Sequence, residues 1–399
     1  MKKIYLLSFV MLCFITSTFA QTWSAQVSGT PNELWGISFI NSNQGWACGT
    51  NGTIVTTSNG GTTWTPQVSG TGTLILRHVN FLNATQGWIV GDSGYIIHTS
   101  NGGTTWTKQT SGVTVVMRGV YFVDASNGWA TGGSGTILHT TNGGATWSPQ
   151  TSGTAIGLQL VQFIDLNNGW TVGSSGGPGN PGIILHTSNG GTTWSTQTAP
   201  NNNNLNGVCF TDLNNGWAGG NLGAMFNTSN GGVTWTAQTN PLTTIIRAIC
   251  FPVDASNGWA VCDSGKIIAT TNGGATWTPE ASGTTQFLRG AYFVSNNLGF
   301  AVGGAGTIIV YTSPLGVNTI QQPINIAVYP NPSAGVFTIE APAEKKVVEV
   351  YNATGQMIYS AVQPSGSSKI DLSNNANGIY FITVKTDSEQ FTSKVIIQK

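Results

Sequence analysis

The sequence predicts an all-β fold made of a ring of repeated four-stranded sheets, followed by a smaller β domain. Three observations support this prediction: an eight-residue motif that returns at regular intervals, a Gly-Trp pair that returns between its copies, and a last repeat that is divided between the two ends of the repeat region. Repeats of about 42 residues with four strand signals each are typical of β-propeller blades.

The first repeated motif is Thr57–Trp64, with the sequence TSNGGTTW. Its tryptophan returns at residues 106, 147, 194, 235 and 277, in steps of 42, 41, 47, 41 and 42 residues, and the longest step contains the insertion Ser175–Pro181. Paired glycines adopt positive φ at little steric cost, and the asparagine side chain can bond nearby backbone amides. The motif therefore indicates a structural turn, whose asparagines are Asn59, Asn101, Asn142, Asn189, Asn230 and Asn272.

The second repeated feature is a Gly-Trp pair between two apolar strand signals. It occurs in six repeats, and Gly299-Phe300 takes its place in a seventh. A large aromatic residue at one fixed place in every repeat predicts packing between sheets rather than chemistry. The tryptophans of these pairs are Trp46, Trp88, Trp129, Trp170, Trp217 and Trp259.

The seventh repeat lacks an outer strand at its own end of the chain. The missing piece matches the other end, because Thr22–Thr30 resembles Thr63–Thr71. Closing the ring in this way removes the exposed edges that an open sheet would present. We therefore expect a seven-bladed β-propeller over residues 21–313, with its last blade completed by the N-terminal strand.

The first twenty residues resemble a secretory signal peptide. Lys2 and Lys3 precede the apolar run Ile4–Phe14, and small residues lead up to Gln21. We expect cleavage before Gln21, an exported protein, and no transmembrane segment in the mature chain. Charged residues make up only 7% of the sequence and the formal net charge is zero, so charge gives no reason to expect nucleic acid as a partner.

A second domain is predicted after a linker at residues 314–325. Its strand signals alternate in the way expected of a small C-terminal β-sandwich over residues 326–399. These signals are Val336–Ile339, Lys346–Tyr351, Gln356–Ser360, Ile379–Thr386 and Phe391–Gln398.

The four arginines of the chain occupy one repeat position, four residues before a repeated phenylalanine. This position opens the innermost strand of each repeat, so its side chains should surround one mouth of the central channel. Arginine bonds carboxylates bidentately, which suggests a binding site for a protein or an acidic glycan, with a tryptophan as a stacking face. The seven residues at this position are Trp35, Arg77, Arg118, Gln159, Asn206, Arg247 and Arg289.

Two other interpretations of these residues stay open. The arginines could have been copied with their repeat and pair only with local carboxylates. Alternatively, the mouth could hydrolyse glycosides, as in a sialidase or a glucanase, with Tyr121 or Tyr292 available. Binding without catalysis is preferred to hydrolysis, because the repeated aspartates share a turn position that is typical of caps. These aspartates are Asp124, Asp165, Asp212 and Asp254.

Histidines and cysteines indicate no metal or cofactor site. His98, His139 and His186 share a strand position but belong to separate repeats. No zinc or phosphate-loop spacing occurs. The mature chain has four cysteines, for which buried free thiols are preferred to disulfides; these are Cys48, Cys209, Cys250 and Cys262.

Two family resemblances follow from these motifs. The turn motif resembles the Asp-box with asparagine in place of aspartate, and the fuller repeat over about residues 22–313 is similar to the photosystem II assembly and stability factor family. That resemblance implies a seven-bladed propeller that binds a partner protein through an arginine-rich patch. The photosynthetic partner is not inferred for this chain.

The C-terminal motifs closely resemble the type A sorting domain of the type IX secretion system. The matching segments are Tyr329–Pro332, Val350–Gly355, Gly378–Tyr380 and Lys394–Lys399. The resemblance implies a Bacteroidetes-type cell, passage through the periplasm, contact with the secretion machinery through residues 326–399, and a secreted or cell-surface location.

Overall fold

The computed structural model describes residues 22–174, 182–313, 327–385 and 390–399. The predicted signal peptide, the predicted linker and the insertion Ser175–Pro181 lie outside these residues. The chain divides into two compact units, Met1–Pro314 and Leu315–Lys399. In the described part of the chain, no helix has the length and apolar character needed to cross a bilayer.

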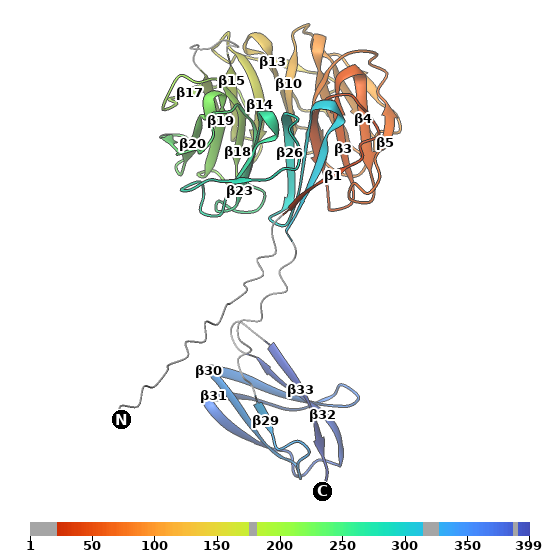
Figure 1. Cartoon of the computed structure of the whole chain (residues 1–399), viewed down its shortest axis with the longest axis vertical. Helices are drawn as coiled ribbons and strands as arrows, with labels where there is room; N and C mark the ends of the chain where they lie inside the picture. The colour runs from red at the N-terminus through yellow and green to blue at the C-terminus, as the bar shows by residue number, and fades with distance from the viewer. Residues whose placement is uncertain (1–21, 175–181, 314–326, 386–389) are drawn as a thin grey trace, which may run out of the picture. The chain divides into compact units, whose positions relative to one another are not determined.

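The first unit contains seven four-stranded antiparallel sheets among its described residues, which confirms the predicted all-β propeller (Figure 1). Blades 1 to 3 comprise β2 (Leu34–Phe39), β3 (Gly45–Gly49), β4 (Thr53–Thr57) and β5 (Thr65–Val68); β6 (Leu76–Phe81), β7 (Gly87–Gly91), β8 (Ile96–Thr99) and β9 (Thr107–Gln109); and β10 (Met117–Phe122), β11 (Gly128–Gly132), β12 (Ile137–Thr140) and β13 (Ser148–Gln150).

Blades 4 to 6 follow the same order along the chain. They comprise β14 (Gly157–Phe163), β15 (Gly169–Ser174), β16 (Ile183–Thr187) and β17 (Ser195–Gln197); β18 (Leu205–Phe210), β19 (Gly216–Gly220), β20 (Met225–Thr228) and β21 (Thr236–Ala237); and β22 (Ile246–Cys250), β23 (Gly258–Cys262), β24 (Ile267–Thr270) and β25 (Thr278–Glu280). The first strands of successive blades contact one another around the axis, and β2 also contacts β26 of the last blade.

Blade 7 joins the two ends of the repeat region. It contains β26 (Leu288–Ser295), β27 (Leu298–Gly303), β28 (Ile308–Thr312) and β1 (Thr22–Gln26). The N-terminal strand β1 pairs antiparallel with β28, from Thr22 opposite Thr312 to Gln26 opposite Ile308. The predicted closure of the ring by the start of the chain is therefore confirmed.

Aromatic side chains fill each seam between blades. The ring of the Gly-Trp pair stacks on a phenylalanine at or near the end of the first strand of the next blade, and Phe300 takes the place of the tryptophan at the closing seam. The seven stacks are Trp46–Phe81, Trp88–Phe122, Trp129–Phe163, Trp170–Phe210, Trp217–Phe251, Trp259–Phe293 and Phe300–Phe39, with centroids 3.5–4.2 Å apart. Such pairs add about 0.5–1.5 kcal/mol beyond the burial of their area.

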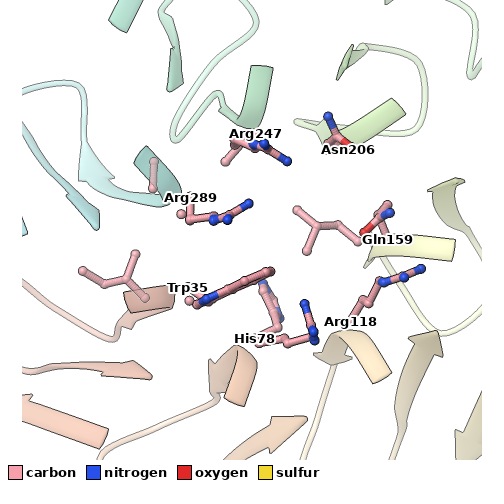
Figure 2. Close-up of a pocket in the computed structure, with 14 residues that line it drawn as sticks. Trp35, His78, Arg118, Gln159, Asn206, Arg247 and Arg289 are labelled. Atoms are coloured by element: carbon pink, nitrogen blue, oxygen red, sulfur yellow. The ribbon is translucent and has the colours of Figure 1, made fainter. Parts of the chain in front are cut away.

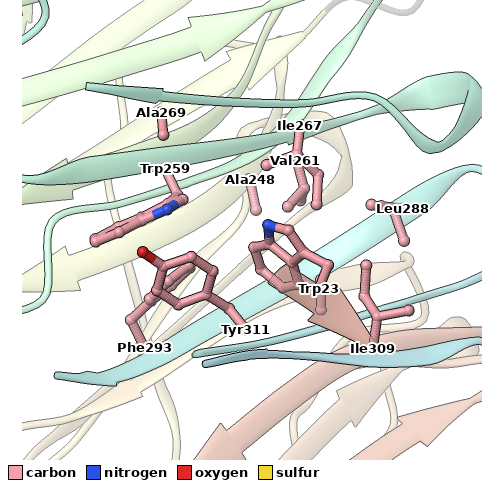
Figure 3. Packing of buried hydrophobic residues seen from close by; sticks show 11 residues of the cluster. Trp23, Ala248, Trp259, Val261, Ile267, Ala269, Leu288, Phe293, Ile309 and Tyr311 are labelled. Carbon is pink, nitrogen blue, oxygen red and sulfur yellow. The ribbon is translucent and has the colours of Figure 1, made fainter. Parts of the chain in front are cut away.

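The second set of tryptophans packs edge-on against the same phenylalanines. Trp147, for example, lies 5.8 Å from Phe122 at 88°. At the closing blade, Trp23 takes this place against Phe293 at 5.9 Å and 86°, and Figure 3 shows Tyr311 between Trp23 and Trp259 of blade 6. The start of the chain thus completes the core of its last blade as well as its hydrogen bonding.

The Asn-Gly-Gly turns act as structural elements, as predicted. Asn142 Oδ1 accepts a hydrogen bond from the Thr146 backbone N–H at 2.9 Å, and Asn142 Nδ2 donates to Thr146 Oγ1 at 2.9 Å. The following Gly143 and Gly144 have φ of 69° and 88°, where a side chain would be strained. The Gly143 carbonyl accepts a hydrogen bond from Trp88 Nε1 of the previous blade at 3.1 Å, so the turn also joins neighbouring blades.

Five strands of the second unit form one sheet. They are β29 (Ala327–Tyr329), β30 (Val336–Asn352), β31 (Met357–Asp371), β32 (Gly378–Lys385) and β33 (Gln390–Ile397). Two strands predicted separately, Val336–Ile339 and Lys346–Tyr351, are parts of the single strand β30, because its pairing with β31 resumes after a register shift between Ala341 and Lys345. Phe337 and Val348, from the two halves of β30, belong to one buried core.

Candidate ligand-binding mouth

The first strands of the blades surround a cavity of about 250 Å³ at the propeller axis. The structure brings all seven residues of the predicted mouth to its wall, as Figure 2 shows for six of them by name. They are Trp35, Arg77, Arg118, Gln159, Asn206, Arg247 and Arg289. The cavity wall also includes His78, which the sequence analysis did not select.

A local irregularity accompanies each mouth residue. The antiparallel register shifts at the start of every first strand, for example between Leu76 and His78 around Arg77, and between Met117 and Gly119 around Arg118. A shift occurs at the same place in the other five blades, and in blade 4 it spans two residues, Gln159 and Leu160. A bulge leaves one residue unpaired and redirects its side chain, which explains why one repeat position supplies the whole wall.

Three of the four arginines form ion pairs. Arg77 Nε donates to Asp92 Oδ1. Arg247 binds Asp263 with both Nε and Nη2, each at 2.8 Å, and Arg289 Nε donates to Glu33 Oε1 at 2.7 Å. The interpretation of local pairing is thus correct for three arginines. The spacing of fifteen or sixteen residues between each arginine and its aspartate was a sequence signal for two of these pairs.

Arg118 differs from the other arginines. It forms no ion pair with any residue that the structure describes, although it lines the same cavity. Burial lowers its pKa, the positive charge of Arg77 lowers it further, and Asp92 raises it. Since arginine remains protonated throughout the physiological range, Arg118 keeps a positive charge in a half-buried place.

Trp35 does not offer the open stacking face that was predicted. The guanidinium carbon of Arg289 lies 4.1 Å from the centre of its ring, and that of Arg77 lies 4.4 Å from it. These arginines come from the blades on the two sides of Trp35, and Figure 2 shows Arg289 against its ring. Trp35 therefore holds two guanidinium groups in place by cation–π contact.

The three remaining polar side chains of the mouth have different environments. Asn206 Nδ2 donates to Asn221 Oδ1 at 3.1 Å and to the Ile246 carbonyl at 2.9 Å. His78 Nδ1 accepts a hydrogen bond from the Val120 backbone N–H at 3.4 Å, and burial lowers the pKa of His78 to about 4, so it is neutral at pH 7. The Gln159 side-chain amide makes no hydrogen bond within the described residues.

The tyrosines considered for glycoside hydrolysis lie elsewhere. Tyr121 and Tyr292 line a separate cavity at the other end of the first strands, next to Cys209 and Cys250, whereas the arginines line the mouth. Burial raises the pKa of both tyrosines. The structure therefore does not bring these tyrosines and the arginines together.

The repeated aspartates cap turns. Backbone N–H groups of Ser256 and Asn257 donate to Asp254 at 2.7 and 2.9 Å, and these bonds lower its pKa to about 2. Asp124, Asp165 and Asp212 accept equivalent bonds in their own blades.

The repeated histidines lie in separate blades and pack on tryptophans. His139 stacks on Trp129 with centroids 4.6 Å apart, and His98 and His186 stack in the same way on Trp88 and Trp170. The four described cysteines are unpaired; Cys48 and Cys262 are buried, and Cys209 and Cys250 are partly buried.

Solved structures with the same fold include proteins of several kinds. YCF48 bound to a D1 peptide has a TM-score of 0.62 and 21% identity, over 73% of this chain and 95% of that chain. PorZ, an essential surface component of the type-IX secretion system of Porphyromonas gingivalis, has a TM-score of 0.58 and 13% identity, over 92% of this chain and 60% of that one.

An enzyme also shares the propeller fold. Virginiamycin B lyase from Staphylococcus aureus, in a catalytically inactive form with quinupristin, has a TM-score of 0.63 and 12% identity, over 74% of this chain and 100% of that chain. The fold alone therefore does not decide whether this propeller is catalytic. The comparison with curated proteins gave no match.

Family models match both parts of the chain. A secretion system C-terminal sorting domain matches residues 327–398, which implies a secreted or cell-surface protein. The model described as photosynthesis system II assembly factor YCF48 matches residues 15–112, 109–249 and 192–279, which together cover more than half of the chain. This chain, with its repeated tryptophans and its arginine-lined mouth, therefore belongs to the YCF48 family of propellers.

Proposed function

We propose that this protein is a non-catalytic binding propeller, displayed outside the cell, whose arginine-lined mouth recognises a carboxylate-bearing peptide segment of a protein partner. One observation carries the proposal: every arginine of the chain lines the same cavity. Arginine would be tolerated at many solvated positions of a propeller, yet this chain uses it only where seven blades converge.

The chemistry of the cavity favours binding over hydrolysis. Glycosidases need two carboxylates that face each other across the substrate, one of them with a raised pKa. No carboxylate belongs to the described wall of the cavity, and the three that lie beside it are held by arginines. A peptide is favoured as the ligand because one propeller of this family binds a peptide, in the complex of YCF48 with a D1 peptide.

Export is proposed to run through the periplasm and the type IX machinery. The sorting domain at residues 327–398 supports this route. Removing residues 326–399 should retain the propeller in the periplasm while its fold survives, because the propeller is a compact unit by itself. Normal appearance of the truncated protein outside the cell would contradict the route.

The binding proposal can be tested with a synthetic mixture of random hexapeptides passed over immobilised full-length protein. The control is a variant with Arg77, Arg118, Arg247 and Arg289 all replaced by glutamine. Wild type should retain acidic peptides, identified by mass spectrometry, and the variant should lose them while its tryptophan fluorescence stays native. Equal retention by both proteins would overturn the proposal, and so would turnover of fluorogenic sialosides or β-glucans by the wild type alone.

A further inference from the structure

Two positions in the repeat can supply a partner to a mouth residue. The first opens the short 3₁₀ turn that follows the second strand of the same blade: η2 (Asp92–Gly94) pairs Asp92 with Arg77, and η5 (Asp263–Gly265) pairs Asp263 with Arg247. In blade 5, the turn η4 (Asn221–Gly223) places Asn221 against Asn206 at 3.1 Å. The turn residue thus contacts the mouth residue in three blades, through an ion pair in two of them and through an amide hydrogen bond in the third.

The second position lies two residues before the mouth residue of the next blade. Glu33 occupies it in blade 1 and pairs across the seam with Arg289 of blade 7 at 2.7 Å. Arg289 needs this partner because its own turn, η6 (Gly304–Gly306), opens with a glycine. Together, the two positions account for every ion pair that the described mouth residues make.

Both positions around Arg118 are glycines. The turn of its own blade, η3 (Gly133–Gly135), opens with Gly133, and the position across the seam in blade 4 is Gly157. The end of Arg118 occupies space that a side chain at Gly157 would fill, because a Cβ atom there would lie 2.5 Å from Nη1. Two absent side chains therefore leave this guanidinium group without a carboxylate in the described structure.

The surroundings of Arg118 complete a site for one anionic group. Gln159, whose side-chain amide has no partner among the described residues, is the mouth residue of the adjacent blade, and Figure 2 shows it beside Arg118. Arg118 also lines a second hollow of about 490 Å³, which it shares with Gly133, Ala155 and Gly157. A chain bound at Arg118 thus has room to leave the axis through this hollow.

Charge limits the ligand to a single negative charge. Around the mouth, the four guanidinium groups are opposed by the three carboxylates that they bind, and His78 is neutral at pH 7. Among the described residues around the mouth, one positive charge therefore has no opposing carboxylate. A phosphate dianion or a run of uronic acids would bring more negative charge than this balance supports.

We propose that Arg118 and Gln159 form the seat for a single carboxylate of the peptide ligand, and that Arg77, Arg247 and Arg289 shape the mouth without binding it directly. This inference rests on the proposed function and assigns its ligand contact to one blade. A carboxylate at Arg118 receives a bidentate pair of charge-assisted hydrogen bonds. The other arginines are already paired with a carboxylate of the chain, whose negative charge opposes the approach of a second one.

The first test uses arginine side-chain NMR, because the chain has only four arginines and all of them line the mouth. The Nε–Hε signals of the ¹⁵N-labelled full chain are assigned by single Arg→Lys variants and followed during titration with N-acetylglycine. The neutral N-acetylglycine methylamide is the control. The Arg118 signal should shift saturably with the acid and stay unmoved with the amide.

The source of the carboxylate is distinguished by a second probe, N-acetylaspartate methylamide, which carries its charge on a side chain. Tighter binding of N-acetylglycine indicates a peptide chain end, and tighter binding of the aspartate derivative indicates an internal acidic residue. Saturable shifts of the Arg77, Arg247 or Arg289 signals with Arg118 unmoved would overturn the assignment. The absence of any arginine shift at 100 mM acid would overturn it as well.

The second test supplies the missing carboxylate from within the chain. Gly133→Asp should neutralise Arg118 as Asp92 neutralises Arg77, and a Cβ atom at this glycine would make only ordinary van der Waals contacts, the nearest at 3.6 Å. We expect a loss of affinity for the acid of about tenfold or more, the size expected for lost charge-assisted hydrogen bonds. Gly133→Ala is the matched control and should bind like wild type.

The two proposals can fail separately. If the fourfold arginine variant loses peptides from the hexapeptide mixture but Gly133→Asp retains them, the mouth binds peptides and the seat at Arg118 is wrong. If the fourfold variant retains them, the proposed function itself is wrong. Loss of binding in both variants, with Gly133→Ala unaffected, supports both.

Discussion

The seams between the blades and the mouth at their axis derive from the same repeat, but they keep it to different degrees. At the seams, an aromatic ring stacks on a phenylalanine in all seven blades, and only the closing seam replaces tryptophan with phenylalanine. At the mouth, one position carries arginine four times and three other residues once each. Packing between blades requires the same shape at every seam, whereas a ligand needs different groups on different sides.

Within the mouth, the contrast between blades 2 and 3 is sharper still. Arg77 and Arg118 occupy equivalent places, and the first residues of their turns are Asp92 and Gly133. The presence or absence of one carboxylate separates a structural ion pair from a charge that is available to a ligand. The arginine proposed to bind the ligand is therefore the one for which its own blade supplies no partner among the described residues.

The largest effect is expected from a substitution that disrupts the packing of a seam. Trp129→Ala removes a ring that is 1% exposed, stacks on Phe163 at 3.6 Å and donates a hydrogen bond to the Gly190 carbonyl. We expect a loss of about 3–5 kcal/mol in the free energy of unfolding. Guanidinium unfolding followed by tryptophan fluorescence measures it. Arg118→Gln at the mouth is the control and should change stability by less than about 1 kcal/mol; equal losses would remove the distinction between the two regions.

The next effect concerns a mouth residue that also joins two blades. His78 has a folded-state pKa of about 4 against an unfolded value of 6.5, so the unfolded chain binds more protons between these values. The contribution of this group to stability should be fully present above pH 6.5 and decline as the pH falls toward 4, by about 3 kcal/mol. Unfolding curves at a series of pH values should show a smaller decline for His78→Gln; parallel curves for the two proteins would contradict this role.

A smaller effect tests the turns that carry the seams. Asn142→Ala removes hydrogen bonds to the Thr146 backbone N–H and to its hydroxyl, and should lower the free energy of unfolding by about 1 kcal/mol. Asn142→Asp keeps the acceptor for the backbone N–H and should stay within about 0.5 kcal/mol of wild type. Thermal unfolding of the three proteins decides this, and an aspartate variant as unstable as the alanine variant would refute the assigned role.

The smallest effect sharpens the comparison of blades 2 and 3. Asp92→Asn removes the charge that neutralises Arg77, so blade 2 should come to resemble blade 3. Affinity for N-acetylglycine should rise about threefold, because long-range attraction between partly solvated charges is weak. The Arg77 Nε–Hε signal should then respond to the acid. An Arg77 signal that stays unresponsive would show that the carboxylate is not what keeps this arginine from the ligand.

Much of the fold could be predicted from the sequence because the same strand and turn signals recur in each repeat. The Gly-Trp pair and the match between Thr22–Thr30 and Thr63–Thr71 predicted the seams and the closing strand β1. The prediction of two separate strands within β30 was wrong. The sequence loses the alternation of side chains between them, but pairing with β31 resumes after the register shift, so the two parts form one strand.

The mouth could be located from the sequence, but its chemistry could not be read in full. Spacing placed the seven residues on one wall, because equivalent positions of a closed ring face a common axis. The ion pairs depend on bulges and turns that direct side chains between elements, and repeat spacing does not report these directions. Trp35 was expected to be open for the same reason, and the arginines on both sides cover its ring instead.

The pairing of β1 with β28 also governs the order in which this protein can fold. Trp23 and its partner Glu280 are 257 positions apart in the chain, with six whole blades between β1 and its place in the sheet. Contacts so distant in sequence form slowly, because the entropy of closing the loop is lost before the contact is gained. The ring therefore closes last, after β28 has been synthesised, and until then the N-terminal strand β1 has no partner strand in its sheet.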